Sequence, residues 1–153
     1  MKEIEGKLSA KGLKVALVAS RFNSFLVEQL VKGAADAYNR LGGDAAGLVL
    51  VRVPGAYEIP VTAKKLAASK KFDAVVGLGA VVQGATAHAA LINETTARAF
   101  TEIALETGVP VVDGVVSAEN LEQAVERCGT KQGNKGFSAM QAAIEMADLM
   151  RKM

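Results

Sequence analysis

The sequence contains few of the residues that hold metals or form disulfides: its 153 residues include one cysteine, Cys128, and one histidine, His88. A single cysteine cannot form an internal disulfide, so the simplest expectation is a reducing, cytoplasmic setting. Because cysteines and histidines do not cluster anywhere in the chain, we do not expect a zinc site.

Long apolar runs and stripes of one charge are missing as well. No uninterrupted apolar stretch is long enough to span a bilayer, and the first residues lack the apolar core of a signal peptide. We therefore expect neither membrane insertion nor export. The net charge is +2 and the two signs are interspersed, which argues against a nucleic-acid-binding surface.

What the sequence does have is the composition of a soluble globular domain. The chain is 50% hydrophobic and 22% charged, and its length suits one domain, residues 1–153, with a real core. A mean hydropathy of +0.23 is high for a small monomer, and it points to apolar surface buried between subunits.

The most informative stretch is residues 72–88. Residues 72–82 form an apolar run rich in β-branched side chains, which predicts a strand buried on both faces, as in a parallel sheet. A turn of small residues follows, with Thr86 as a candidate N-cap, and then a helical pattern over residues 87–107. Free amides at such a helix start favour an anion, and His88 beside them can move protons on it. The alternative is a surface turn with an incidental histidine.

Other strands and helices alternate with this unit. Strands are predicted at residues 14–19, 47–53 and 111–116, with a short one at 3–8; helices are predicted at 23–41, from about 60, at 120–128 and, after a loop over 129–136, from 137 onward. Asn23 or Ser24 is the expected N-cap of the first helix. Right-handed crossovers place helices on both faces of the sheet. The predicted fold is a flavodoxin-like, three-layer α/β/α sandwich with a mainly parallel four-stranded sheet.

Ligands of such sheets bind beyond the carboxyl ends of the strands. Four segments fall at that edge: Phe22, residues 55–58, residues 80–88 and Asp113. Their convergence favours a binding site over the ordinary structural interpretation of each residue alone, which is core packing for Phe22 and helix-start electrostatics for Glu58.

Five blocks of sequence then occur in the order and at the spacing of a known family. They are EGKL at residues 5–8, SRFN at 20–23, VPGAYEIP at 53–60, GATAH at 84–88 and GTKQGNKG at 129–136. With them the chain resembles the lumazine synthases over its whole length. The resemblance implies condensation of 5-amino-6-(D-ribitylamino)uracil with 3,4-dihydroxy-2-butanone 4-phosphate, the penultimate step of riboflavin biosynthesis, without a metal or organic cofactor.

The resemblance also assigns roles to residues. His88 matches the proton-transfer residue. The aminouracil site is matched by Phe22, Ala56, Tyr57, Glu58, Ala80, Val81, Val82, Asp113 and Lys135, and the phosphate site by Ala85, Thr86 and Arg127. A permanently charged guanidinium fork suits phosphate, whereas the ordinary alternative for Arg127 is a charge serving the helix dipole. In the family, Arg127 and Lys135 would come from the neighbouring subunit.

Several positions depart from the family's pattern. Residues 89–91 are Ala-Ala-Leu where aromatic and acidic residues are usual, and Asp113 stands where an aromatic side chain helps to pack the pyrimidine. Gln83 and Ser138 replace a common Arg and a frequent Glu. The lost bulk predicts that His88 is held less firmly, and Asp113 can still hydrogen-bond ring or ribityl groups.

Alternatives to an active enzyme stay open at this point. The departures favour a non-catalytic, shell-forming or ligand-binding paralogue, whereas the retained Phe22, Glu58, Thr86, His88, Arg127 and Lys135 argue against it. An archaeal-type riboflavin synthase conflicts with the intact GTKQGNKG block, and a generic flavin-binding protein is the remaining option.

The resemblance further implies a homo-oligomer built from pentamers. The compact segment 129–136 predicts that twelve pentamers close into a sixty-subunit shell, with residues 3–8 joining a neighbour's sheet by β-addition. Riboflavin synthase is a candidate partner beside the small-molecule substrates. We expect no nucleic-acid or membrane partner.

Overall fold

The computed structural model describes residues 1–129 and 133–153. Residues 130–132, in the middle of the GTKQGNKG block, lie outside the described residues. The strands are β1 (Val15–Ser20), β2 (Leu48–Val53), β3 (Ala74–Val82) and β4 (Val111–Ala118). The helices are α1 (Ser24–Arg40), α2 (Ile59–Ala68), α3 (His88–Thr107), α4 (Leu121–Arg127) and α5 (Lys135–Lys152), with short 3₁₀ turns η1 (Ala45–Gly47) and η2 (Ala56–Glu58).

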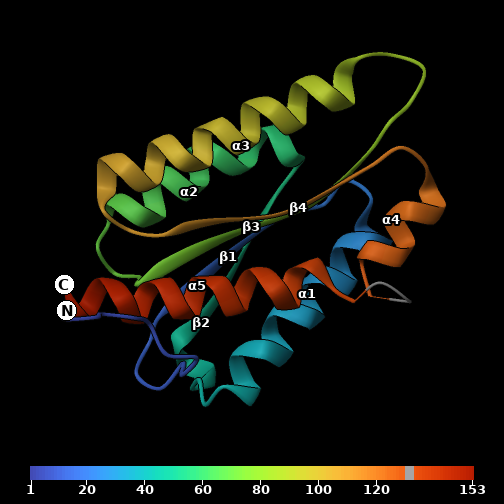
Figure 1. The fold of residues 1–153 in the computed structure, drawn as a ribbon. Coiled ribbons are helices and arrows are strands. Elements are labelled where there is room, and N and C mark those ends of the chain that lie inside the picture. The colour runs from blue at the N-terminus through green and yellow to red at the C-terminus, as the bar shows by residue number, and fades with distance from the viewer. Residues whose placement is uncertain (130–132) are drawn as a thin grey trace.

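The strands form one parallel sheet in the order β2-β1-β3-β4. Helices α2 and α3 cover one face, and α1 and α5 cover the other (Figure 1). This arrangement confirms the predicted three-layer, flavodoxin-like fold. Within the described residues, no helix has both the length and the apolarity needed to cross a membrane.

The two helical layers explain why the central strands are apolar at consecutive positions. Leu17 and Val76 pack in the core formed with α1 and α5, whereas Val18 and Val75 pack in the core formed with α2 and α3. Because successive side chains of a strand point to opposite faces, a sheet covered on both sides needs an apolar residue at every position.

Residues 3–8 are not a strand, so that prediction is wrong for the single chain. The segment lies along α5, where the amide of Lys7 donates to Asp148 Oδ2 at 2.7 Å, and the two termini lie beside each other (Figure 1). A Cβ added to Gly6 would lie 2.1 Å from the carbonyl oxygen of Glu145, so glycine permits this close approach. A strand needs a neighbouring strand, and this chain offers none there.

Thr86 is not the N-cap of α3, which corrects a second prediction. The helix begins at His88 with Ala87 at the N-cap position and without a capping side chain. Thr86 therefore lies two residues before the first helical residue, too early for its hydroxyl to meet the first-turn amides.

Candidate functional site

A pocket of about 380 Å³ lies at the carboxyl ends of the strands, and we call it the central pocket. Its walls come from the end of β1, the turn after β2, the end of β3 and the start of α3. From β1 the chain adds β2 on one side, and β3 lies on the other. The pocket thus sits at the point where the strand order reverses, the usual ligand position in open α/β sheets.

The central pocket brings together most of the predicted site residues. Those that line it are Phe22, Ala56, Tyr57, Glu58, Ala80, Val81, Val82, Thr86 and His88. The side chains of Phe22 and Tyr57 are 71% and 68% exposed, so neither ring serves as core packing. Exposed rings beside a pocket offer flat apolar surfaces on which a planar ligand can stack.

Hydrogen bonds between loops hold the aromatic end of the pocket in place. The amide of Phe22 donates to the carbonyl of Pro54 at 3.1 Å, which ties the loop after β1 to the loop after β2. Asn23 is the N-cap residue of α1, as predicted, but its side chain does not cap the helix. Instead its Nδ2 donates to the carbonyl of Ala80 at 2.9 Å and so joins the end of β3 to the loop that carries Phe22.

The other end of the pocket is the start of α3. The amide of Leu91 donates to Ala87 at 3.3 Å, and the helix ladder therefore leaves the amides of residues 88–90 without intrahelical acceptors. His88 is exposed, and no described residue hydrogen-bonds to its imidazole. Free amides, the helix dipole and a mobile imidazole together suit an anion on which protons are moved.

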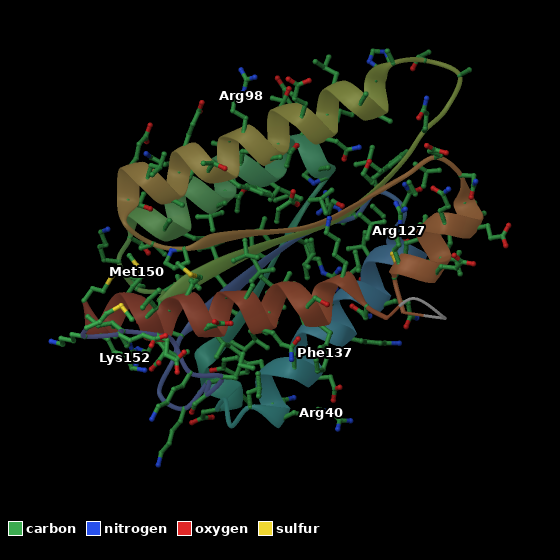
Figure 2. All side chains as sticks on the ribbon, in the orientation of Figure 1. Arg40, Arg98, Arg127, Phe137, Met150 and Lys152 are labelled. Carbon is green, nitrogen blue, oxygen red and sulfur yellow. The ribbon has the colours of Figure 1, made fainter. Side chains whose placement is uncertain are left out.

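Four predicted site residues lie outside this pocket. Ala85 is exposed in the turn before α3, between Gly84 and Thr86, which do line the pocket. Asp113, Arg127 and Lys135 all gather at the free edge of β4 (Figure 2 labels Arg127). The structure therefore does not bring Asp113, Arg127 and Lys135 together with His88 within one chain.

The β4 edge shows how these three side chains are used in the single chain. The carbonyls of Pro110 and Ala118 accept from β3, so by strand alternation the odd-numbered residues between them direct their backbone groups away from the sheet. Lys135 Nζ donates to the carbonyl of Val115 at 2.6 Å, and Arg127 Nη1 donates to that of Ser117 at 2.5 Å.

Asp113 completes this arrangement, because its Oδ1 accepts from the amide of Val115 at 2.9 Å. Charged side chains on an exposed edge protect it against uncontrolled strand pairing. The same position also presents a carboxylate, a guanidinium and an ammonium to whatever packs against β4.

Sequence reasoning missed some of the residues that line the central pocket. They are Ser20, Asn23, Ala89 and Ile92. Ser20 could have been found, since a polar residue that ends an apolar strand at the ligand edge is unusual. Ile92 stands one helical turn after His88, so the predicted helix would have placed it on the same face as His88.

Cys128 offers no second reactive centre. It is buried, and burial raises the pKa of its thiol to about 11, so the thiol stays protonated at neutral pH. A nucleophilic cysteine needs an accessible thiolate.

The sheet is parallel and flavodoxin-like, and its pocket lies where the strand order reverses. Exposed rings and the start of α3 surround that pocket. These features define an α/β protein whose pocket suits a small, flat ligand. The family described as 6,7-dimethyl-8-ribityllumazine synthase matches residues 12–151. A protein of that name from Chlorobium chlorochromatii is 48% identical over 153 residues, covering 100% of this chain and 99% of the relative.

Two further relatives carry the same name. The protein from Desulfotalea psychrophila is 52% identical over 147 residues, covering 96% of this chain and 95% of its own. The protein from Syntrophus aciditrophicus is 47% identical over 149 residues, covering 97% of each chain. The chain belongs to the 6,7-dimethyl-8-ribityllumazine synthase family. None of these relatives favours the non-catalytic alternative.

Proposed function

We propose that the chain catalyses the condensation of 5-amino-6-(D-ribitylamino)uracil with 3,4-dihydroxy-2-butanone 4-phosphate to 6,7-dimethyl-8-ribityllumazine, a step of riboflavin biosynthesis. One observation carries the proposal beyond family membership: the central pocket joins the exposed rings of Phe22 and Tyr57 to the start of α3 with His88. One end suits a flat ring, and the other suits a phosphate and a proton transfer.

The chemistry follows from this division. The pyrimidine stacks on Phe22, and the backbone of residues 80–82 and the carboxylate of Glu58 meet its polar edge and its ribityl chain. The exocyclic amine attacks the ketone and forms an imine with loss of one water. Phosphate then leaves beside the amides of α3, and ring closure releases a second water. His88 moves protons between these steps, and holding two reactants together supplies much of the rate.

A cation for the phosphate is the part that one chain lacks in its central pocket. Among the described residues that line it, His88 is the only one whose side chain can carry a positive charge, and Arg127 lies on the β4 edge instead. We assign Arg127 and Lys135 to the pocket of a neighbouring subunit, so each site spans an interface. Asp113 on the same edge would then meet the aminouracil of that neighbour.

Shared sites require an oligomer, and we propose a pentamer that assembles into a sixty-subunit shell. The edge strand β2 exposes Val49 and Leu50, and residues 3–8 have no strand partner in their own chain. β-Addition of residues 3–8 to a neighbour's sheet would use both features. Light scattering measures the assembly: a stable five-subunit species would exclude the shell, and a monomer would exclude shared sites.

The cellular setting follows from the pathway and the lone cysteine. We place the enzyme in the cytoplasm, where its lumazine product passes to riboflavin synthase as a candidate partner. Co-sedimentation of the two purified enzymes tests that association.

The activity is tested by turnover of the two named substrates, with and without EDTA. We expect lumazine formation well above the uncatalysed condensation, and the same rate with EDTA, because every proposed step uses side chains and amides of the chain. A rate equal to the uncatalysed background would overturn the assignment.

Shared sites can be tested by mixing two impaired variants. Phe22→Ala removes the ring platform of one wall, and Arg127→Ala removes the cation of the other. Subunits refolded or co-expressed at equal ratio should regain about a quarter of the sites, since random neighbours in a ring combine the intact walls at that frequency. If both walls came from one chain, mixing would restore nothing.

A further inference from the structure

Ser20 is a buried polar residue whose hydroxyl group has no role in the contacts of its own chain. It is the last residue of β1 and lines the central pocket, and only 1% of it is exposed. No described residue hydrogen-bonds to its side chain. Among the described residues, Thr96 Oγ1 is the one fully enclosed side-chain atom without a partner, so Ser20 Oγ is not enclosed and opens into the pocket that it lines.

The hydroxyl of Ser20 lies on the side of β1 that faces β3. The register pairs Ala19 with Leu78, so Ser20 stands level with Gly79. A Cβ added to Gly79 would lie 3.1 Å from Ser20 Oγ and 3.6 Å from the Cβ of Ala56. Because Gly79 has no side chain, the space beside the hydroxyl stays free, as it does where a backbone approaches a ligand closely.

This position belongs to the ring end of the pocket and not to its phosphate end. Gly79 precedes Val82, the last residue of β3, by three residues, which is roughly 10 Å of strand. The start of α3 with His88 follows only after the turn beyond Val82. Ala56, in contrast, lies beside the same part of β3 and is one of the residues assigned to the aminouracil.

The loop that carries Phe22 is held over the same part of β3. Asn23 Nδ2 donates to the carbonyl of Ala80, the residue directly after Gly79. A ring stacked on Phe22 is therefore held close to the strand position beside which the hydroxyl of Ser20 lies.

A neutral hydroxyl suits the edge of such a ring chemically. A uracil ring carries two carbonyl oxygens, and a serine hydroxyl can donate one hydrogen bond. Phosphate would need positive charge instead, and the groups around Gly79, which are Ser20, Ile59 and Ala56, carry none. A buried hydroxyl without a partner is unfavourable, so a ring carbonyl that accepts its hydrogen removes a cost as well as adding a contact.

We propose that Ser20 is a further substrate-binding residue, whose hydroxyl donates a hydrogen bond to a ring carbonyl of the aminouracil and fixes the ring's orientation within its plane. The inference rests on the proposed function, which stacks this ring on Phe22. Stacking on Phe22 sets the plane of the ring, whereas a directional hydrogen bond at the edge sets its rotation in that plane. The contact is the same before and during the reaction, so it acts on binding and not on the chemical step.

Ser20→Ala tests the contact by steady-state kinetics and by binding. KM for the aminouracil should rise about threefold to tenfold, the loss expected for one neutral hydrogen bond, while kcat and KM for the ketone phosphate stay the same. Calorimetric titration with the aminouracil alone should show the same factor in Kd. Ser24→Ala is the matched control, because Ser24 is exposed and does not line the pocket, and it should change neither constant. Unchanged KM and Kd in Ser20→Ala would overturn the inference.

Two analogues of the aminouracil, each lacking one of the two ring carbonyl oxygens, identify the atom that accepts the bond. The factor in Kd between Ser20→Ala and the unaltered enzyme should disappear for one analogue and persist for the other. A factor that persists for both would show that the hydroxyl does not donate to a ring carbonyl.

Ser20→Cys separates hydrogen bonding from the filling of space, and it keeps the test decisive if the smaller alanine disturbs the fold. A thiol occupies about the same place as the hydroxyl but donates weakly. Kd for the aminouracil should therefore rise in Ser20→Cys nearly as much as in Ser20→Ala. Affinity equal to that of the unaltered enzyme would mean that Ser20 only fills space, and the inference would be wrong.

The binding measurements separate this inference from the proposed function. If turnover fails but Ser20→Ala still weakens binding of the aminouracil and Ser24→Ala does not, the proposed activity is wrong and the role of Ser20 stands. If turnover succeeds and Ser20→Ala changes neither KM nor Kd, the activity stands and the role of Ser20 is wrong.

Discussion

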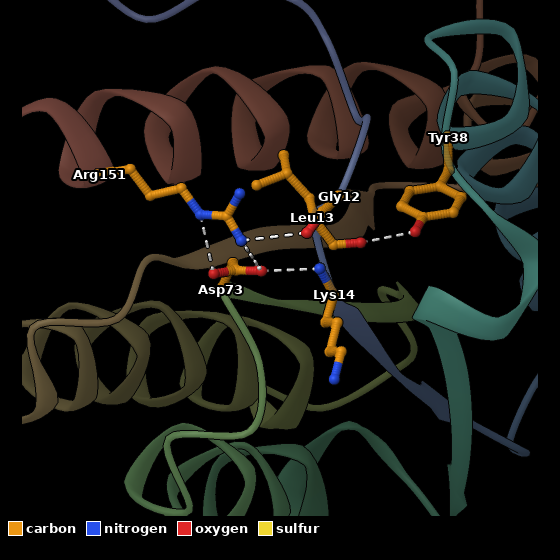
Figure 3. A network of polar contacts seen from close by, with 6 residues as sticks. All are labelled: Gly12, Leu13, Lys14, Tyr38, Asp73 and Arg151. Carbon is orange, nitrogen blue, oxygen red and sulfur yellow. Dashed lines mark hydrogen bonds and ion pairs between the residues drawn. The ribbon is translucent and has the colours of Figure 1, made fainter.

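Polar groups at the two ends of the sheet differ in whether they have hydrogen-bond partners within the chain. At the amino end, Asp73 accepts from the amide of Lys14 at 2.7 Å and from Arg151 Nη2 at 2.9 Å, and Arg151 also donates to Gly12 at 3.1 Å (Figure 3). Tyr38 closes the network with a 2.7 Å hydrogen bond to Leu13. At the carboxyl end, the imidazole of His88 has no partner within the described chain.

This difference separates groups that hold the fold from groups that await a ligand. Asp73 and Arg151 are far apart in the sequence, and their ion pair ties the end of α5 to the start of β3. The Asp73 carboxylate already accepts hydrogen bonds from the Lys14 amide and from Arg151 Nε and Nη2, so it is satisfied without a ligand. Around the central pocket the free amides and the exposed rings are available to a bound molecule.

The largest effect should come from removing a hydrogen-bond acceptor at the amino end of the sheet. Asp73→Ala leaves the Lys14 amide and the Arg151 guanidinium without their acceptor, and we expect the unfolding free energy to fall by about 3 kcal/mol, since hydrogen bonds to charged groups are the stronger ones. Turnover per folded molecule should stay the same. Urea unfolding at fixed protein concentration measures the change.

Asp36→Ala is the matched control for this loss. Asp36 also pairs with an arginine, Arg40, but its side chain is 50% exposed and one turn away on the same helix. Such a pair contributes about 0.5 kcal/mol or less. Equal losses for the two variants would mean that the amino-end network is no more than an exposed ion pair.

The next largest effect is expected at the carboxyl end of the sheet, where the phosphate is proposed to bind. Arg127→Ala should lower kcat/KM for the ketone phosphate by about tenfold to hundredfold, because a charge-assisted contact is lost, while binding of the aminouracil changes little. Steady-state kinetics with each substrate varied in turn measure the split. Arg98→Ala is the control, since Arg98 projects from α3 and pairs with the exposed Glu94 (Figure 2). Equal weakening of both substrates would remove Arg127 from the phosphate role.

The sequence predicted the fold well because its signals were local. An apolar run such as residues 72–82 requires cover on both faces, and that requirement alone predicts a parallel sheet with helices on each side. The ligand edge was predictable as well, because parallel strands place their carboxyl ends together. Phe22, Glu58 and His88 reach one pocket for that reason.

What the sequence could not show depends on contacts between distant segments. Lys135 and Arg127 donate to the carbonyls of β4 that point away from β3. Which carbonyls point that way depends on which side of β4 pairs with β3, and no local sequence pattern encodes that pairing. The capping pattern predicted Asn23 at its helix start, but the side chain crosses to Ala80 instead. Residues 3–8 have strand-like sequence and lack a partner strand in their own chain.

A smaller effect is expected at His88. His88→Ala should lower kcat by about tenfold, less than the hundredfold that a firmly positioned acid–base residue commonly contributes, because the chain does not hold its imidazole. The pH profile of kcat should lose the limb that the imidazole contributes. His88→Gln, which keeps a hydrogen-bonding group without titrating, should show the same flattened profile. A profile that keeps that limb in both variants would assign the proton transfer to another group.

The smallest effect should come from the bond that joins the two strand ends beneath the aromatic platform. Asn23 has a left-handed backbone with φ of 57°, which glycine adopts without strain, so Asn23→Gly removes the side-chain bond to Ala80 and little else. We expect KM for the aminouracil to rise about fivefold, equivalent to the roughly 1 kcal/mol of a typical hydrogen bond. Asn23→Ala should be worse than glycine, because alanine is strained at that φ. Equal KM values for Asn23→Gly and the unaltered enzyme would show that Phe22 is positioned by the Pro54 contact alone.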